Sequence, residues 1–286
     1  MTSEGEGLRI AITMQSLDPT WGGIGIYTIE LVRSLLRLDR KNSYLLVYPN
    51  FGPARSRIGQ FKRRYDNVEE VIAQGPRIPI ATIWDQFILP RTLREHKIDV
   101  LFNPYWSVPI RGNYKKIIIM HAVERHTLRK VFDLKRRIQQ SIREMVLIGA
   151  ADRIVSISNV MTEDLQRHMK IPPDKIRTVY HGLSDKFRVI DDREAFARIS
   201  TEYRLPEKFI LFVGHVYPQK NFGNLLRAFA ALSADLPHHL VVAGQPRWKF
   251  AEDYALIEEL GLKDRIRFLY FVENDDLPYL YNMASC

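Results

Sequence analysis

The chain has 286 residues, of which 46% are hydrophobic and 26% charged, the composition of an ordinary globular protein. No apolar run approaches the roughly 20 residues of a membrane-spanning helix, and Cys286, the only cysteine, excludes an intrachain disulfide and a cysteine-ligated metal site. The net charge of +9 is unevenly spread: residues 1–190 hold 31 Lys and Arg against 19 Asp and Glu, whereas residues 191–286 hold 11 against 14.

The resulting net charge of +12 on residues 1–190, against −3 on the rest, has two interpretations. This part either meets an anionic membrane surface, nucleic acid or phosphorylated acceptor, or it has a solvated basic surface. Basic and aromatic residues are not interleaved as in a nucleic-acid-binding module, so no nucleic-acid partner is expected. The start, MTSEGEGLRIAIT, lacks the basic region and long apolar core of a signal peptide. The single cysteine favours a reducing compartment, with the cytoplasm as the default.

Short β-branched runs alternate with amphipathic stretches, a pattern typical of an α/β protein with mostly parallel sheets. In chain order, the predicted strands are 8–13, 44–48, 68–72, 98–102, 116–120, 153–157, 176–180, 209–214, 239–244 and 265–270. The predicted helices are 24–38, 86–96, 128–149, 160–169, 222–233, 252–260 and 276–284. The polar stretch 183–205 predicts a boundary between a domain of residues 1–187 and a second domain of residues 188–286. Three strands make the second domain incomplete.

The first predicted strand leads through the loop SLDPTWGGIGIYT into the first helix. Gly22, Gly23 and Gly25 permit close approach of the backbone to a ligand and place N–H groups at a helix start. This is not the dinucleotide-binding fingerprint, because its third glycine position holds Thr28, and the Walker pattern is also absent. The loop is therefore interpreted either as part of a ligand site or as a plain turn.

His121 follows the apolar run that ends at Met120, so it is predicted at the carboxyl end of a buried strand, where open α/β sheets bind ligands. An imidazole there is suited to a sugar or phosphate oxygen, although a structural histidine fits the same position. Glu124, Arg125 and His126 follow closely and are candidates for the same cleft. No HExxH or GxSxG motif occurs, so neither a metal site nor a nucleophile elbow is expected.

Lys220 marks the second candidate site. The strand-like run that ends at Gly214 is followed by a short loop with this one cation and then by a helix, for which Asn221 is the predicted cap. An ammonium group and a helix N-terminus at the carboxyl edge of a sheet both attract phosphate. The stretch therefore favours a nucleotide-diphosphate ligand, with a generic strand-to-helix connection as the alternative.

Seven segments, taken together, resemble glycosyltransferase family 4, the GT-B enzymes that use nucleotide-sugar donors. They are GGIGIYTIELVRSLL (22–36), MHAVERHT (120–127), SISNVMTEDL (156–165), VYHG (179–182), FILFVGHVYPQKNFGNLLRAF (209–229), VVAGQPRW (241–248) and RIRFLYFVENDDLPYLYNMAS (265–285). The resemblance covers nearly the whole chain in the family's order. It implies two Rossmann-like domains whose parallel sheets face each other across a cleft, the second domain being incomplete.

The resemblance also implies a role for particular residues. His121 would contact the transferred sugar and Lys220 would bind the donor diphosphate, so these two are the implied catalytic residues. The other implied contacts are Gly22, Gly23, Gly214, His215 and Val272 on the donor side, and Ser158 and Glu124 on the acceptor side. The family is typically retaining, and neither a metal nor another cofactor is implied for the chemistry.

Three features depart from the family pattern. Ala122 stands where members usually have Asp, and His215 or Gln219 stands where many carry Arg. The family's segment of two Glu separated by seven residues would begin shortly after residue 286. The sequence is therefore interpreted as a C-terminally truncated enzyme, and the 286-residue form is expected to have little or no activity.

The expected function is that of a retaining glycosyltransferase in cell-surface polysaccharide synthesis. It would move mannose, or a similar hexose or deoxyhexose, from a nucleotide-diphosphate sugar to a glycan or polyprenyl-linked acceptor. The basic first domain suits an anionic membrane surface, which places the protein in the cytoplasm, peripheral at the inner face of the membrane. The alternative is a non-catalytic GT-B-like binding protein, which Ala122 and the missing segment would favour.

Overall fold

The computed structural model describes the chain apart from residues 1–6, 18–21, 77–79, 122–145, 217, 233–234 and 247–249. The chain forms two compact units, Met1–Gly182 and Leu183–Cys286, and each is described by itself. The contacts thus divide the chain after Gly182, whereas the sequence predicts a division after residue 187. None of the helices in the described part has both the length and the apolar character that crossing a membrane requires.

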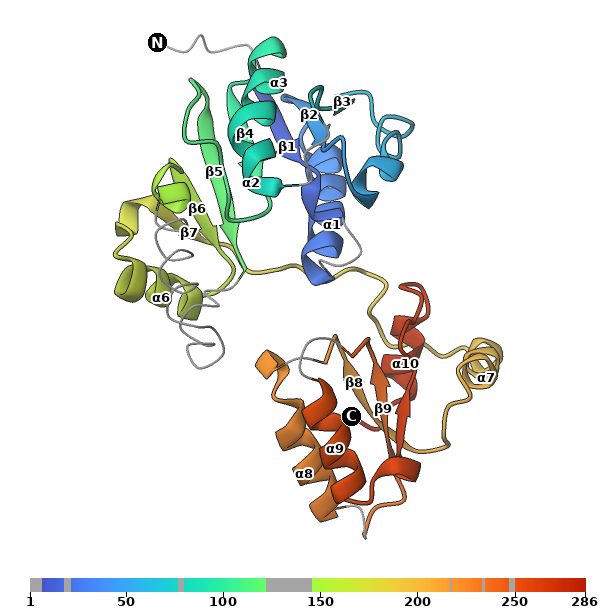
Figure 1. Cartoon of the computed structure of the whole chain (residues 1–286). Coiled ribbons are helices and arrows are strands. Elements are labelled where there is room, and N and C mark those ends of the chain that lie inside the picture. Colours follow the sequence, from blue (N-terminus) through green and yellow to red (C-terminus); the bar gives the residue numbers. More distant parts are fainter. Residues whose placement is uncertain are drawn as a thin grey trace. The chain divides into compact units, whose positions relative to one another are not determined.

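The first unit contains a seven-stranded parallel sheet with the order β3-β2-β1-β4-β5-β6-β7 (Figure 1). The strands are β1 (Arg9–Thr13), β2 (Ser43–Tyr48), β3 (Val68–Ile72), β4 (Val100–Asn103), β5 (Lys115–Met120), β6 (Arg153–Ser156) and β7 (Ile176–Thr178). Each predicted strand in this part of the sequence is present. The central strands are continuous apolar runs because both faces of a parallel sheet are covered.

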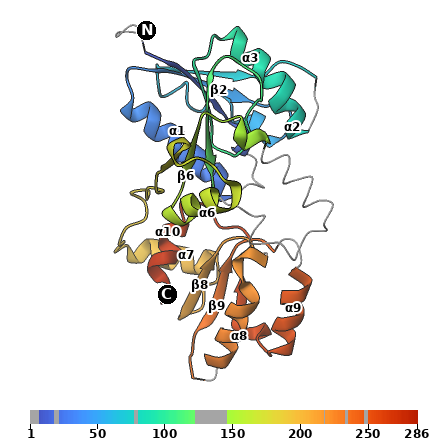
Figure 2. The same cartoon turned by 90° about the vertical axis from the view of Figure 1, so that its left-hand side faces the viewer.

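Helices cover both faces of this sheet, as Figure 2 shows for α1 and α3. The helical elements are η1 (Gln15–Leu17), α1 (Gly23–Leu38), η3 (Pro53–Arg57), α2 (Ala81–Ile83), the π-helical turn η4 (Trp84–Ile88), α3 (Leu89–Glu95), α6 (Asn159–Met169) and η5 (Pro173–Lys175). Neighbouring residues of β1 belong to separate apolar clusters, Ala11 with Trp84 and Ile12 with Leu36. This follows from the alternation of side chains along a strand.

The second unit contains a three-stranded parallel sheet with the order β10-β9-β8. Its strands are β8 (Phe209–Val213), β9 (His239–Ala243) and β10 (Ile266–Phe268), and its helical elements are α7 (Arg193–Glu202), η6 (Pro218–Lys220), α8 (Phe222–Leu232), α9 (Phe250–Glu259), η7 (Lys263–Arg265) and α10 (Leu277–Met283). One apolar cluster joins α8 and α9 to the sheet, and a second joins α7 and α10 to it. The predicted α/β class with parallel sheets is confirmed.

The outer edge of β8 is paired with the last two residues of the chain. The Ser285 N–H donates to the Phe209 carbonyl over 2.8 Å, and the Leu211 N–H donates to the Cys286 carbonyl over 2.8 Å. Residues 285–286 therefore extend the hydrogen bonding of the sheet beyond β8.

Two predictions need correction. The sequence predicts no helix in the stretch 183–205, yet it contains α7, whose N-cap Asp192 accepts a hydrogen bond from the Ala195 N–H over 2.9 Å. Ile199 is fully buried, but most of α7 is exposed, so the sequence lacks a clear apolar stripe. The helix predicted to begin at residue 86 belongs to a helical stretch that begins at Ala81. Most of the predicted helix 128–149 lies outside the described residues.

Candidate active site

The carboxyl edge of the seven-stranded sheet contains a topological switch point. β1 pairs with β2 on one side and with β4 on the other, so the strand order reverses between β1 and β4. Open α/β sheets form their ligand crevice outside the carboxyl ends of the strands at such a point. The residues that follow β1, β4 and β5 are therefore the first to consider for a site.

Three ring side chains meet at this edge: Tyr27 from α1, His121 after β5 and His181 after β7. The Tyr27 ring meets the His121 ring edge-on, with centroids 4.8 Å apart and planes at 80°. It lies 4.6 Å from the His181 ring at 35°, and the two imidazoles are 5.6 Å apart. Sequence reasoning singled out His121 alone, because no local pattern links Tyr27 or His181 to it.

His121 is held in one protonation state. Its Nε2 lies 3.1 Å from the Pro104 carbonyl oxygen, which only accepts hydrogen bonds, so Nε2 carries the proton. Burial lowers the pKa of His121 to about 4, the Pro104 hydrogen bond offsets this in part, and His181 lowers the pKa further. The imidazole is therefore neutral at pH 7, with a lone pair on Nδ1 that accepts hydrogen bonds.

The rest of the ring cluster is uncharged for the same reason. Desolvation lowers the pKa of His181 below its usual value of 6.5 and raises that of the Tyr27 phenol above 10. A neutral group of aromatic rings beside a hydrogen-bond acceptor suits the apolar faces and hydroxyl groups of a sugar better than a charged ligand.

The glycines at the start of α1 have different structural roles. Gly22 occupies the N-cap position with φ 53° and ψ −121°, a conformation that favours glycine. A Cβ on Gly25 would lie 2.8 Å from the Ser16 carbonyl oxygen, whereas a Cβ on Gly23 would meet nothing within 4 Å. Thr28, at the third fingerprint position, is buried and hydrogen-bonded to Ser16 and to the Ile24 carbonyl. Gly22 and Gly25 are thus required by the fold, and Gly23 is not.

Of the two predicted acceptor-side residues, the structure describes Ser158. Ser158 is the N-cap of α6, and its Oγ accepts a hydrogen bond from the Met161 N–H over 3.1 Å. The hydroxyl therefore already has a structural role. Glu124 and the departure at Ala122 lie outside the described residues, as do Arg125 and His126.

In the second unit, the segments that leave β8 and β9 run side by side at the carboxyl edge. A Cβ on Gly244 would lie 1.9 Å from the Gly214 carbonyl oxygen, so the two backbones are in direct contact. Gly214 itself has φ 139°. The Gln245 N–H donates to His215 Nδ1 over 3.3 Å, and the Val216 N–H donates to the Gln245 carbonyl over 3.1 Å. Gly214 and His215, both predicted donor contacts, are thus held in a defined loop.

Lys220 lies at the same edge, at the end of η6 and just before α8. Its Cε is 3.9 Å from the position that a Cβ on Gly214 would occupy, so the side chain folds back toward the end of β8. Asn221 precedes α8 with φ 54°, and its carbonyl accepts from the Asn224 N–H over 3.1 Å. The structure therefore brings together Gly214, Lys220 and the first turn of an 11-residue helix.

Val272, predicted to lie along a nucleotide base, is a core residue. Its side chain is 9% exposed and belongs to the cluster that includes Ile199, Ala243 and Leu280. A ligand beside it would meet its backbone rather than its side chain. Its neighbours Tyr270 and Phe271 follow β10 and are exposed, a feature that has no signal in the local sequence. Among the described residues, no group of three or more His, Cys, Asp or Glu is arranged to hold a metal ion.

Family models match both units. Residues 21–187 match the model described as Glycosyltransferase Family 4, and residues 194–286 match the model described as Glycosyl transferases group 1. The first of these covers more than half of the chain. The order of the two matches along the chain is that of the two units.

Two curated relatives and one solved structure are also similar to the chain. O-antigen chain mannosyltransferase B of Escherichia coli is 24% identical over 97% of this chain and 74% of its own length. The N-acetylgalactosamine-N,N'-diacetylbacillosaminyl-diphospho-undecaprenol 4-alpha-N-acetylgalactosaminyltransferase of Campylobacter jejuni is 32% identical over 61% of this chain and 44% of its own. Sucrose-phosphate synthase of Thermosynechococcus elongatus has a TM-score of 0.71 at 18% identity, over 97% of this chain and 71% of that one, which is a likeness of fold.

Proposed function

The chain belongs to glycosyltransferase family 4 and has the GT-B fold, and from this premise we propose its donor, its acceptor and its site residues. The proposed reaction moves mannose, or a similar hexose or deoxyhexose, from a nucleotide-diphosphate sugar with retention of configuration. The proposed acceptor is a glycan or a polyprenyl-linked glycan of the cell surface. The relatives named as an O-antigen mannosyltransferase and as a transferase onto a diphospho-undecaprenol compound support this choice.

His121 is proposed to contact the transferred sugar. At neutral pH its Nε2–H is used by the Pro104 carbonyl, so the imidazole offers a ligand only the lone pair on Nδ1. A phosphate oxygen has no proton to donate to this lone pair, whereas a sugar hydroxyl has one. The state of His121 therefore favours a sugar hydroxyl over a phosphate oxygen.

Lys220 is proposed to bind the donor diphosphate. Its side chain lies against Gly214, and only Asn221 separates it from the start of α8, so an ammonium group and helix N–H groups are available at one edge of the sheet. Both favour negative charge, and they would stabilise the charge that develops on the leaving diphosphate. Gly214 and His215 are proposed as backbone and side-chain neighbours of the same group. The roles that the family resemblance implies are proposed for the remaining residues: donor contacts for Gly22, Gly23 and Val272, and acceptor contacts for Ser158 and Glu124.

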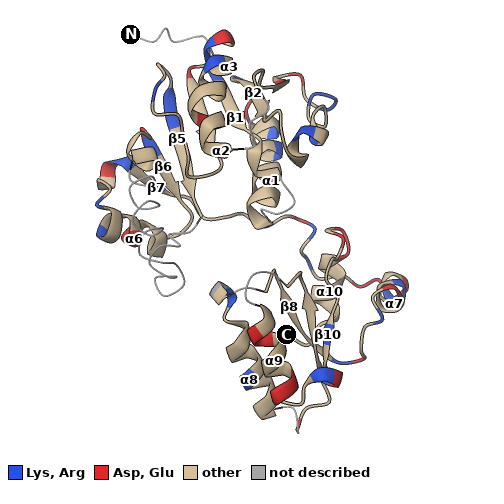
Figure 3. Ribbon diagram, viewed as in Figure 1, with Lys and Arg blue, Asp and Glu red and all other residues tan. Residues whose placement is uncertain are grey.

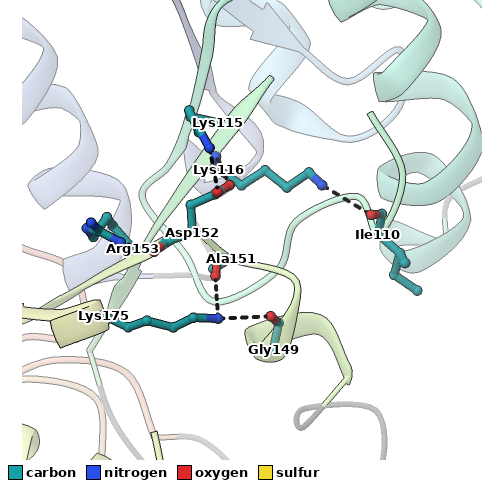
Figure 4. A network of polar contacts seen from close by, with 8 residues as sticks. All are labelled: Ile110, Lys115, Lys116, Gly149, Ala151, Asp152, Arg153 and Lys175. Atoms are coloured by element: carbon teal, nitrogen blue, oxygen red, sulfur yellow. Dashed lines mark hydrogen bonds and ion pairs between the residues drawn. The ribbon is translucent and has the colours of Figure 1, made fainter. Parts of the chain in front are cut away.

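The basic first part of the chain is proposed to face an anionic membrane surface, where a lipid-linked acceptor would be presented. Figure 3 shows Lys and Arg on several elements of the first unit. Some of these cations have internal partners, as Figure 4 shows: Lys115 pairs with Asp152 over 3.2 Å, and Lys175 binds the Ala151 carbonyl over 3.2 Å. The exposed run Lys62, Arg63 and Arg64 is a better candidate for such a contact.

The observation that carries the donor site is the juxtaposition of Lys220, Gly214 and the start of α8. It is tested by calorimetric titration of the 286-residue chain with GDP, UDP, ADP and dTDP. We expect one nucleotide to bind, and we expect Lys220→Ala to weaken that binding at least tenfold. Lys263→Ala is the matched control, because this exposed lysine lies just before β10, at the opposite edge of the same sheet.

Two results would count against the assignment. If none of the four nucleotides binds, the Lys220 loop is only a connection between a strand and a helix. If Lys220→Ala and Lys263→Ala weaken binding equally, the effect reflects overall charge rather than a site.

A further inference from the structure

The loop that holds His121 is itself held by a line of buried polar groups. Thr13 Oγ1 on β1 donates to Asn103 Oδ1 at the end of β4 over 2.6 Å. Asn103 Nδ2 donates to the Ser107 carbonyl, and Ser107 Oγ donates to Asp85 Oδ2 over 2.6 Å. The four side chains are 1%, 2%, 3% and 1% exposed in the order Thr13, Asn103, Ser107, Asp85. At such burial each group depends on its partner, because a buried polar group that is left unpaired destabilises the fold.

The far end of the same loop is fixed as well. Gln86 Nε2 donates to the Val108 carbonyl over 3.0 Å, and Gln86 Oε1 accepts from the Ile110 N–H over 2.9 Å. Lys116 Nζ donates to the Ile110 carbonyl over 3.1 Å (Figure 4). Residues 104–110 are therefore hydrogen-bonded from three elements: β4, β5 and the π-helical turn η4.

The two residues that hold this loop from η4, Asp85 and Gln86, are adjacent in the chain. A π-helical turn is uncommon and is often found at functional sites. Apolar packing does not explain the Asp85 carboxylate at this position. Its neighbour Trp84 and the loop residue Val108 are fully buried in one apolar cluster. A buried carboxylate is costly unless it is hydrogen-bonded, so its bond to Ser107 favours one conformation of the loop.

We infer that this network is the positioning device for His121. Asp85, Gln86 and Asn103 hold the 104–110 loop in place, so that the Pro104 carbonyl selects the tautomer of His121 with the proton on Nε2. The inference rests on the proposed contact of His121 with the sugar, because only this tautomer presents Nδ1 as the acceptor. The network residues act through Pro104 and are positioning residues.

The test reads the tautomer directly. Long-range ¹H–¹⁵N NMR of the full chain with ¹⁵N-labelled histidine, at pH 7.5, reports which ring nitrogen carries the proton, and His121→Gln assigns the signal. The wild-type should show one tautomer, protonated at Nε2. Ser107→Ala and Gln86→Ala should each give a mixture that includes the Nδ1–H tautomer. Ser107→Thr keeps the hydroxyl and should keep the wild-type signal.

Asn67→Ala is the matched control for the loss of a side chain that fixes a loop. Asn67 Nδ2 donates to the Asp39 carbonyl over 2.9 Å, at the amino end of β3 and so at the opposite edge of the sheet. This variant should leave the His121 signal unchanged. A change of the same size in Asn67→Ala would overturn the inference, because the tautomer would then respond to any loosening of the unit.

The inference is also overturned if folded Ser107→Ala and Gln86→Ala both retain the wild-type tautomer. If Ser107→Ala does not fold, Gln86→Ala decides, since Gln86 is only partly buried. A tautomer change that leaves the affinity for the donor nucleotide sugar unaltered in calorimetric titration supports the positioning network and refutes the proposed contact of His121 with the sugar. The two proposals therefore fail on different measurements.

Discussion

At the scale of single residues, the environment rather than the residue type decides what His121 offers a ligand. A solvated histidine with a pKa of about 6.5 exchanges between charged and neutral forms near physiological pH. Burial removes this ambiguity, and the Pro104 carbonyl removes the choice of tautomer. The result is a neutral acceptor, which fits a sugar hydroxyl.

The depressed pKa of His121 predicts acid sensitivity. Because its folded pKa of about 4 lies below the usual 6.5, the unfolded chain binds the proton between these pH values and the native state does not. The contribution of neutral His121 to the free energy of unfolding is fully present above pH 6.5 and is lost as the pH falls through 4. The loss is at most about 3 kcal/mol. The His121→Gln variant should not show this fall in the free energy of unfolding, because glutamine does not bind the proton. Urea unfolding of both proteins between pH 7.5 and 4 measures it, and parallel curves would contradict the prediction.

The contact between Gly244 and Gly214 predicts a strong effect of one methyl group. Gly244→Ala would place its Cβ 1.9 Å from a backbone oxygen, so the exits of β8 and β9 must separate, at a cost of at least about 2 kcal/mol. Gly223→Ala in α8 is the control, because its Cβ would be 3.4 Å from Asp253 Oδ1. It should stabilise the helix by up to about 1 kcal/mol. Thermal unfolding of both variants tests this, and equal melting temperatures would show that the backbone contact is unimportant.

At the scale of elements, α7 is attached to the rest of the second unit through the start of α10. Tyr203, directly after α7, donates its hydroxyl to Asp276 Oδ2 over 2.8 Å and accepts from the Glu273 N–H over 3.3 Å. Arg198 reaches the other oxygen of Asp276 over 3.3 Å. Burial and the Asp276 hydrogen bond together raise the pKa of Tyr203 to about 12, so the phenol remains a donor. This explains how a mostly polar helix is held against the sheet.

Removing the Tyr203 hydroxyl should therefore destabilise the protein. Tyr203→Phe keeps the ring and loses both hydrogen bonds, with an expected cost of about 1–2 kcal/mol in the free energy of unfolding. Tyr254→Phe is the control, since Tyr254 on α9 is 51% exposed, and it should change stability by less than about 0.5 kcal/mol. Urea titration compares the two. A Tyr203→Phe protein as stable as the control would mean that apolar packing alone holds α7.

The strands were predicted well and α7 was not, for one physical reason. A strand covered on both faces contains a contiguous apolar run, such as residues 117–120 in β5, and is visible in a short window of sequence. α7 buries Ile199 fully and leaves most of its length exposed, so its local pattern resembles a polar linker. The π-helical turn η4 likewise has no local signature that separates it from an α-helix.

At the scale of the whole molecule, the uneven charge predicts where an anionic surface would bind. The run Lys62, Arg63 and Arg64 is exposed, and each basic residue near an anionic membrane contributes about 1 kcal/mol. Replacing all three by Gln should weaken co-sedimentation with phosphatidylglycerol vesicles at least tenfold. Binding should also weaken as the salt concentration is raised from about 50 to about 300 mM, because ions screen exposed charges.

Vesicles of phosphatidylcholine are the control for this charge effect, and no binding to them is expected. If the triple variant binds anionic vesicles as well as the wild-type does, the basic charge of the first unit is a solvated surface. The glycosyltransferase assignment would be unaffected, since it depends on the family match and the fold.

The sequence by itself determined the order of the strands, the parallel α/β class and the family, because apolar periodicity and loop motifs are local properties of the chain. It also singled out His121 and Lys220 from their positions after strands. Only the tertiary structure decided the meeting of Tyr27 with His121 and His181 and the protonation of His121. It alone decided the buried network behind the Pro104 loop, in which Thr13 and Asn103 are 90 residues apart. Burial and hydrogen-bond partners arise when distant segments pack together, and no short window of sequence contains them.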